Sequence, residues 1–174
     1  MQSANHDRVF ICGRPGEGKS ALAGYLIRQW PRNFVWVFDP THDKAFALYK
    51  RCDLDNPPPR RNCLVLLDEA DRLAGSQRYE ADWVRELVNR GRNNNVTWIC
   101  AAKRPQTVHR DVTSFATVAY IFALTGSRDV DYLVDEWGDR CELVRDLGEH
   151  EFMRIYPRNY REALTVHKLR FRDI

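Results

Sequence analysis

Short apolar runs recur along the chain and alternate with segments of mixed polarity. The runs are nearly continuous, which is typical of parallel strands that are covered on both faces. We expect strands at residues 9–12, 33–38, 63–67, 96–101 and 117–124. Because segments of helical or loop character separate these strands, the order of elements predicts an α/β fold with right-handed crossovers.

The segments between the apolar runs supply the expected helices. We expect them at residues 20–29, 42–50, 79–89 and about 128–136. In the third segment, Trp83 and Leu87 are four residues apart, which places them on one face of a helix. Residues 53–62 include three consecutive prolines, which have no amide hydrogen to donate, and we expect a loop there.

The last part of the chain has a different character. Residues 151–156 and 163–169 have strand-like patterns and flank an expected turn at 157–160. This arrangement predicts an antiparallel strand pair that is added at the edge of the sheet.

Length and charge narrow the class of protein only slightly. A chain of 174 residues is long enough to bury most of its apolar surface in one core. We therefore predict a single domain over residues 1–174, with a core at about 8–156 and a C-terminal β addition at about 150–174. The formal net charge of +3 is compatible with a nucleic-acid partner but does not demand one.

Cysteine usage and hydropathy bear on the compartment. No apolar run approaches the length of a transmembrane helix, and the polar start of the chain lacks the apolar stretch of a signal peptide. We expect no integral membrane segment. The five cysteines form no C-x-x-C pair, and Cys12, Cys63 and Cys100 fall inside expected strands. They are interpreted as core residues in a reducing compartment, which favours the cytoplasm.

A glycine-rich octet at residues 13–20 carries the strongest chemical signal. It satisfies the pattern G-x-x-x-x-G-K-[ST] between an expected strand and an expected helix, the context in which such a loop binds the phosphates of ATP. Its glycines let consecutive amides point at phosphate oxygens, and the helix start adds its positive end. Lys19 is expected to reach the β- and γ-phosphates and Ser20 to bind Mg²⁺. We predict nucleotide contacts from Gly13, Arg14, Pro15, Gly16, Glu17, Gly18, Lys19, Ser20 and Ala21.

Two acidic residues close the third expected strand. Asp68 and Glu69 follow the apolar run 63–67, and ligands of α/β sheets bind at the carboxyl ends of the strands. Asp68 suits the support of Mg²⁺, and Glu69 suits the activation of the water that attacks the γ-phosphate. The alternative is that these acids simply open a helix, where the dipole favours them. Asp39 ends the second strand, where a place at the catalytic edge and a turn before Pro40 are equally good interpretations.

Together these motifs resemble the FtsK–HerA superfamily of P-loop ATPases, and within it the small genome-packaging ATPases of bacteriophages and related viruses. The resemblance covers roughly residues 8–156. Its anchors are the loop at 13–20, Phe38-Asp39-Pro40, Leu67-Asp68-Glu69-Ala70, Asn89-Arg90-Gly91-Arg92-Asn93, the strand that ends in Lys103-Arg104-Pro105, Ile121-Phe122-Ala123-Leu124 and Arg128-Asp129-Val130-Asp131-Tyr132-Leu133.

The resemblance implies a RecA-like (ASCE) fold and a motor driven by ATP hydrolysis. Such motors are homo-oligomeric rings, pentamers or hexamers, that thread double-stranded DNA and can dock on a capsid portal or vertex protein; the setting would be the host cytoplasm. An arginine of one subunit reaches the γ-phosphate held by its neighbour. Arg90 and Arg92 match that motif, and Arg92 is preferred, although arginines at the end of a helix also favour its dipole.

One position departs from the family pattern. Lys103 stands where the family usually carries Gln before Arg-Pro, at the end of a strand that lies beside the phosphate-loop strand in the family's sheet order. A lysine there could contact phosphate as a point charge, or it could turn toward DNA.

DNA would be held mainly through its phosphates, because such contacts carry no sequence information and permit movement. The candidate basic groups are Lys50, Arg51, Arg60 and Arg61; then Lys103, Arg104, His109 and Arg110; and, in the tail, Arg154, Arg158, Arg161, Lys168, Arg170 and Arg172. Three other functions share parts of the pattern: a small-molecule kinase, a nucleotide-controlled switch, and a filamentous-phage morphogenesis ATPase. The switch class lacks support, because the guanine-specifying Asn-Lys-x-Asp segment does not occur in the chain.

Overall fold

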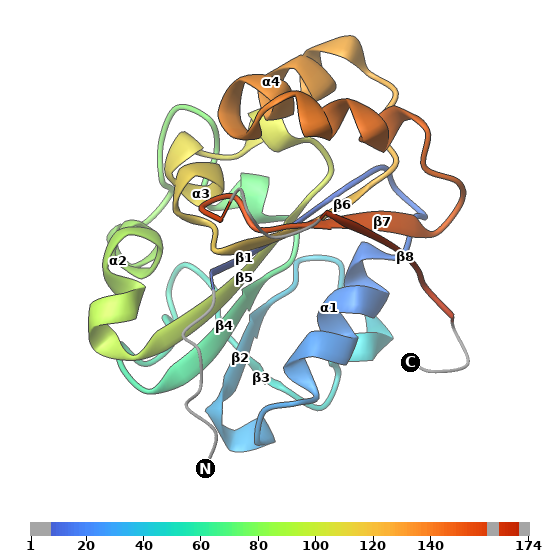
Figure 1. Ribbon diagram of the computed structural model, residues 1–174. Coiled ribbons are helices and arrows are strands. Elements are labelled where there is room, and N and C mark those ends of the chain that lie inside the picture. Colours follow the sequence, from blue (N-terminus) through green and yellow to red (C-terminus); the bar gives the residue numbers. More distant parts are fainter. Residues whose placement is uncertain (1–7, 160–163, 171–174) are drawn as a thin grey trace.

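The fold is built on a central sheet of eight strands in a computed structural model that describes residues 8–159 and 164–170. The strand order is β3-β2-β4-β5-β1-β6-β7-β8 (Figure 1). The strands are β1 (Arg8–Cys12), β2 (Val35–Phe38), β3 (Lys50–Arg51), β4 (Cys63–Leu67), β5 (Val96–Ala102), β6 (Val118–Phe122), β7 (Glu151–Ile155) and β8 (Thr165–Lys168). All five expected strands are present, and the α/β class is confirmed.

Strands β1 to β6 are parallel to their neighbours, while β7 and β8 are antiparallel additions beyond β6. The expected C-terminal strand pair is therefore confirmed, although residues 160–163, which include the end of the expected turn, lie outside the described residues. Strand β5 lies beside β1 in the register Val9↔Ile99. This neighbour relation is the one that the resemblance implied for the strand ending at Lys103.

The helices are mostly where the sequence pattern predicts them. The α-helices are α1 (Lys19–Ile27), α2 (Asp82–Arg90), α3 (Arg110–Phe115) and α4 (Ser127–Trp137); the 3-10 turns are η1 (Arg32–Phe34), η2 (Lys44–Phe46), η3 (Ala70–Arg72), η4 (Gly91–Asn94), η5 (Pro105–Thr107) and η6 (Asp139–Arg145). Helix α2 begins three residues later than expected because Tyr79 pairs with Ala74 in an isolated β-bridge. Helix α3 and the turns of η6 were not expected from the sequence pattern.

The prediction of a helix at 42–50 is wrong. The segment contains only η2, where the Asp43 carboxylate accepts the amide of Ala45, and then enters β3 alongside β2. The physical reason is that Phe46 is buried whereas Leu48 is 68% exposed, so the segment has no continuous apolar face that would hold a helix on the sheet.

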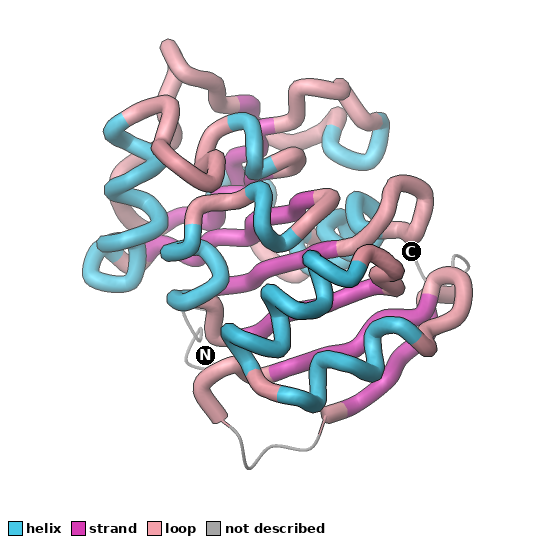
Figure 2. Tube along the Cα trace, turned by 90° about the horizontal axis from the view of Figure 1, so that it is seen from above, coloured by secondary structure: helices cyan, strands magenta, loops and turns pink. Residues whose placement is uncertain are grey.

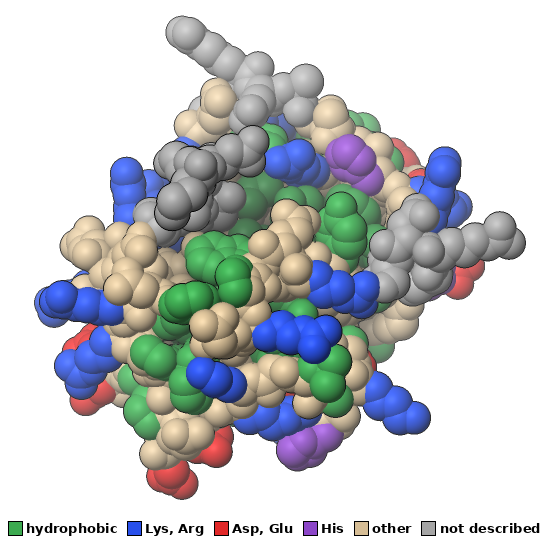
Figure 3. Space-filling view, turned by 90° about the horizontal axis from the view of Figure 1, so that it is seen from below, with side chains coloured by type: hydrophobic (Ala, Val, Ile, Leu, Met, Phe, Trp, Pro, Cys, Tyr) green, Lys and Arg blue, Asp and Glu red, His purple; other side chains and the backbone are tan. Residues whose placement is uncertain are grey.

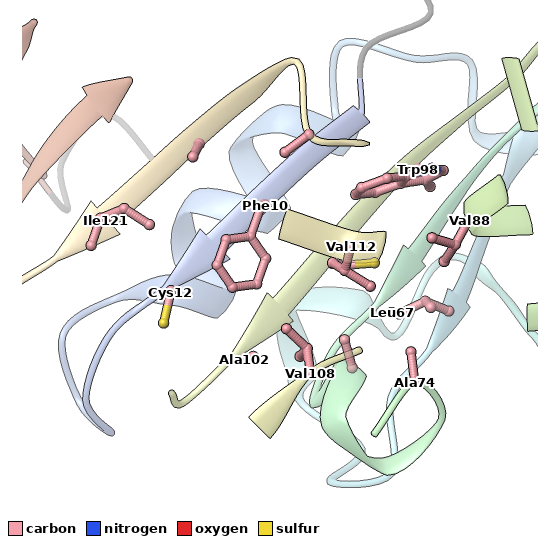
Figure 4. Packing of buried hydrophobic residues seen from close by; sticks show 14 of the residues in the cluster. Phe10, Cys12, Leu67, Ala74, Val88, Trp98, Ala102, Val108, Val112 and Ile121 are labelled. Carbon is pink, nitrogen blue, oxygen red and sulfur yellow. The ribbon is translucent and has the colours of Figure 1, made fainter. Parts of the chain in front are cut away.

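The sheet is covered on both faces, so successive residues of each strand enter two separate cores. On one face, Ile11 and Leu66 pack with α1 and η2; on the other, Phe10 and Trp98 pack with α2, α3 and α4. Figure 2 shows the helices beside the strands of the sheet. Figure 4 shows the second core, in which Phe10, Trp98 and Val112 come from different elements. Burial of one such side chain contributes about 1.5–3 kcal/mol, and this packing fixes the strand ends that carry the site.

The face that contains α1 is less completely covered. A hollow of about 420 Å³ opens between α1 and the sheet, lined by residues that include Trp30, Ile99 and Tyr120. Seen from below, the molecule shows hydrophobic side chains among Lys and Arg, with acidic side chains mainly toward the edges (Figure 3). None of the helices within the described ranges is long and apolar enough to cross a membrane.

Candidate nucleotide site

The glycine-rich octet connects β1 to α1 at the carboxyl edge of the parallel strands. Gly18 is the N-cap of α1 with a φ of 104°, and no side chain caps the helix. The first turn also contains no acidic residue. The amides at the start of α1 therefore remain available to an anion, which the helix dipole also favours.

Gly13 is required by close packing. A Cβ at this position would lie 2.5 Å from the Cβ of Phe122 on β6, closer than two carbon atoms can approach without displacement of the backbone. The loop therefore sits directly against β6, and its start is fixed by contact with the sheet.

Lys19 reaches back across the loop. Its Nζ donates to the carbonyl oxygen of Arg14 at 2.8 Å, so the ammonium lies over the loop that would enclose phosphates. Burial lowers the pKa of Lys19 below its ordinary value, although the nearby Cys12 and Asp68 act in the opposite direction.

Ser20 and Asp68 come together beneath the loop. The Ser20 hydroxyl donates to Oδ2 of Asp68 at 3.1 Å, which joins the start of α1 to the end of β4. Burial raises the pKa of Asp68 to about 6, and Asp39 and Glu69 add to the rise, while the hydrogen bond from Ser20 opposes it. A buried carboxylate beside a hydroxyl is an oxygen donor set that fits Mg²⁺.

A cavity of about 180 Å³ adjoins this pair. Its lining includes Pro15, Gly16, Lys19, Ser20, Thr41, Asp68, Glu69 and Lys103. Residues predicted from three separate parts of the sequence therefore share one cavity at the carboxyl edge of the sheet.

Glu69 has an unusual backbone and two cationic neighbours. Its φ of 53° and ψ of 52° are in the left-handed region, which is uncommon for a residue with a side chain and is frequent at functional sites. Its Oε1 accepts from Nζ of Lys103 at 2.7 Å, and its Oε2 lies 2.7 Å from Nε of Arg72. Arg72 was not predicted as a site residue; the i, i+3 spacing from Glu69 is the signal that could have identified it.

Asp39 is held by its own turn. Its Oδ1 accepts from the amide and hydroxyl of Thr41, and its Oδ2 accepts from Arg51 at 3.0 Å. These are the contacts of a turn-forming aspartate. Asp39 nevertheless lies close enough to Asp68 to raise its pKa.

Arg90 and Arg92 lie at the amino ends of the parallel strands, opposite the end that carries the phosphate loop. Both are exposed, at the end of α2 and in η4, immediately before β5 begins. Within the described residues neither guanidinium forms an ion pair or a hydrogen bond. Because β5 is parallel to β1, its length of seven residues separates them from the phosphate loop by about 20 Å. Neither arginine can reach the loop of its own chain.

Most of the candidate DNA-binding cations have partners within the chain. Lys103 pairs with Glu69, Arg51 with Asp39, Arg104 with the buried Asp129, Arg110 with Glu136 and Lys168 with Glu151. Arg60 is 83% exposed and lies 3.9 Å from Glu86. Arg161 and Arg172 lie outside the described residues.

With this geometry established, comparison with known families gives a direct result. The family described as "ATPase family associated with various cellular activities (AAA)" matches residues 9–123, which is more than half of the chain. The chain belongs to this AAA ATPase family. The matched span contains the phosphate loop, Asp68, Glu69 and both arginines. No curated protein sequence matches this AAA ATPase significantly.

Solved structures extend the comparison at the level of the fold. The genome-packaging NTPase B204 of Sulfolobus turreted icosahedral virus 2, in complex with ATP-gammaS, has a TM-score of 0.78 and 13% identity, with 95% of this chain and 98% of B204 covered. The DNA-packaging ATPase B204 of Sulfolobus turreted icosahedral virus has a TM-score of 0.73 and 12% identity, with 94% of this chain and 97% of that chain covered. The N-terminal domain of zonular occludens toxin from Neisseria meningitidis has a TM-score of 0.56 and 11% identity, with 93% of each chain covered. The resemblance to viral packaging ATPases is confirmed as a likeness of fold.

Proposed function

We propose that this AAA ATPase is a DNA translocase that packages double-stranded viral DNA into a capsid as a ring of five or six identical subunits. The observation that carries the proposal is the single cavity in which the phosphate loop, the Ser20–Asp68 contact and Glu69 meet. The likeness in fold extends over nearly the whole length of B204, which is a genome-packaging NTPase. This likeness supports the choice of a packaging motor.

The charged and hydroxyl-bearing residues predicted for the cavity have distinct proposed roles. The loop amides and Lys19 hold the triphosphate, while Ser20 and Asp68 hold Mg²⁺. The ion would neutralise charge on the phosphate oxygens during transfer. Glu69 accepts a proton from the attacking water. As it does so, the oxygen of the water bonds to the γ-phosphorus, and the bond between the γ-phosphorus and the bridging β–γ oxygen breaks. Lys103 stands beside Glu69 at the same cavity and is the proposed contact for the γ-phosphate.

A neighbouring subunit would complete the site. Arg92, or Arg90, is exposed and lies about 20 Å from its own phosphate loop by the rise of β5. An arginine at this distance can reach a γ-phosphate only if the ATP is bound by another copy of the chain. There it would neutralise the charge that develops on the γ-phosphate. This separation supports a ring in which each subunit contributes to the next one's site.

The experiment that tests the proposal combines Glu69→Gln with DNA. We expect Glu69→Gln to bind ATP as the wild type does but to hydrolyse it at least about a hundredfold more slowly, because the amide cannot accept the proton of water. Double-stranded DNA should stimulate wild-type turnover. The affinity of the protein for DNA should fall steeply with salt concentration and hardly vary with DNA sequence. Glu142→Ala, which removes an exposed, ion-paired glutamate on η6, is the matched control.

The outcomes separate the parts of the proposal. Unchanged turnover in Glu69→Gln would reject Glu69 as the base. A competent ATPase that neither binds DNA nor responds to it would reject the translocase and favour another P-loop function, such as a small-molecule kinase.

A further inference from the structure

A buried carboxylate inside the phosphate loop calls for an explanation. Glu17 follows three exposed residues, 14–16, yet its side chain is only 8% exposed. A negative charge in a loop that holds phosphate would oppose binding if it faced the ligand. Glu17 is not among the residues that line the 180 Å³ cavity, so its carboxylate is directed to other partners.

Those partners belong to the loop itself and to the turn before β7. Oε1 of Glu17 accepts from the Arg14 guanidinium at 2.8 Å, and Oε2 accepts from the backbone N–H of His150 at 3.2 Å. The carbonyl oxygen of Glu17 lies 3.1 Å from Nδ1 of His150. Because a carbonyl can only accept, the imidazole must carry its proton on Nδ1 in this contact. Two chain segments 133 residues apart are thus joined by two hydrogen bonds, both donated by His150 and accepted by Glu17.

The turn that receives Glu17 is itself well defined. His150 has a φ of 61°, and its carbonyl oxygen accepts the amide of Leu169, the residue after β8, at 3.0 Å. Gly148 donates its amide to the Glu151 carboxylate at 3.0 Å. The backbone of His150 therefore contacts the phosphate loop with its N–H and the end of the C-terminal strand pair with its C=O.

We propose that Glu17 is a positioning residue and that the Glu17–His150 contact fastens the phosphate loop to the C-terminal strand pair, so that β7 and β8 support the ATP site. The predicted nucleotide contact from Glu17 is not made by its carboxylate, which fixes the loop whose amides bind the phosphates. This inference rests on the proposed function, because it takes residues 13–20 to be the phosphate-binding loop. A loop held in its binding conformation loses less conformational freedom when ATP binds, which improves affinity without a new contact to ATP.

The test measures steady-state ATPase kinetics of the full chain. We expect Glu17→Ala to raise KM for ATP about tenfold or more, the change expected on loss of charge-assisted hydrogen bonds, while kcat at saturating ATP stays close to wild type. Glu17→Gln keeps one acceptor oxygen and should raise KM less. His150→Gly keeps the N–H and accommodates the positive φ but removes the imidazole, so it should raise KM moderately. The double variant should raise KM further than Glu17→Ala alone, because the two changes remove different hydrogen bonds of the same contact.

A second measurement and two fallback variants keep the test decisive. Amide hydrogen exchange of residues 13–18 should accelerate in Glu17→Ala and stay unchanged in the control Glu142→Ala. If Glu17→Ala does not fold, Glu17→Gln and His150→Gly decide the question. A wild-type KM and unchanged exchange would overturn the inference, and so would a fall in kcat without a change in KM, because Glu17 would then act on the chemical step.

Failure of this inference can be told from failure of the proposed site. Lys19→Ala should abolish ATP binding if residues 13–20 hold the triphosphate. If Lys19→Ala loses binding while Glu17→Ala retains it, only the positioning role is wrong. If both variants retain ATP, the phosphate-loop assignment itself is wrong.

Discussion

Asp68 offers a quantitative test of the site, because the structure indicates that its charge is costly to the fold. Its pKa rises from 3.8 to about 6 on folding, chiefly through burial. At about 1.36 kcal/mol per pKa unit, a rise of roughly two units means that the ionised carboxylate lowers the free energy of unfolding by about 3 kcal/mol near neutral pH. A neutral side chain of the same shape would avoid this cost.

The sign follows from the direction of the shift. A raised pKa in the folded state favours the protonated form, so the contribution of Asp68 to stability is fully present below pH 3.8 and is lost as pH rises through about 6. Asp68→Asn should therefore be more stable than wild type by up to about 3 kcal/mol at pH 7.5, and by about half as much at pH 5. The amide oxygen of asparagine can still accept the hydrogen bond from Ser20.

The assay is equilibrium urea unfolding of both proteins at the two pH values, in chelator and without nucleotide. Asp131→Asn, which changes an aspartate with a 63% exposed side chain, is the control and should alter stability by less than about 0.5 kcal/mol. An Asp68→Asn protein that is less stable than wild type at pH 7.5, or whose advantage is the same at both pH values, would refute the reasoning. With Mg²⁺ and ATP present, the order should reverse, because ligand binding stabilises only a competent site.

Two other predictions concern the proposed trans-acting arginine and the lysine that lines the cavity. In mixed rings, Arg92→Ala subunits should inactivate their neighbours, so that ATPase activity falls faster than the wild-type fraction; activity that merely follows that fraction would contradict a trans role, and Arg85→Ala on the preceding helix α2 is the control. Lys103→Gln should lower turnover severalfold, because it removes the proposed contact to the γ-phosphate; a marked rise in turnover would instead show that Lys103 restrains Glu69, whose Oε1 it contacts at 2.7 Å.

The parts of the fold that the sequence predicts well are those with local causes. The strands are continuous apolar runs because both faces of the sheet are covered, and the phosphate loop follows from glycine spacing between a strand and a helix. The error at 42–50 arose where the local pattern is weak: Phe46 alone is buried there, and pairing with β2 decided the structure. Such tertiary overrides are not visible in helical periodicity.

The site shows the same division between local and distant causes. The positions of Lys19, Ser20 and Asp68 follow from the rule that ligands bind at the carboxyl ends of strands. The contact between Glu17 and His150 does not, because it depends on how a turn far along the chain packs against the loop. The left-handed backbone of Glu69 is likewise a product of its surroundings.

The two outermost strands bear on how copies of the chain can associate. One border of the sheet is the two-residue β3, and the other is β8, whose four residues are all exposed. Lys50 and Lys168 stand on these borders, and a lysine on an edge strand discourages the addition of a foreign strand. Assembly by continuation of the β-sheet from one copy into the next is therefore disfavoured, and copies are expected to meet through side chains and helices rather than through backbone pairing.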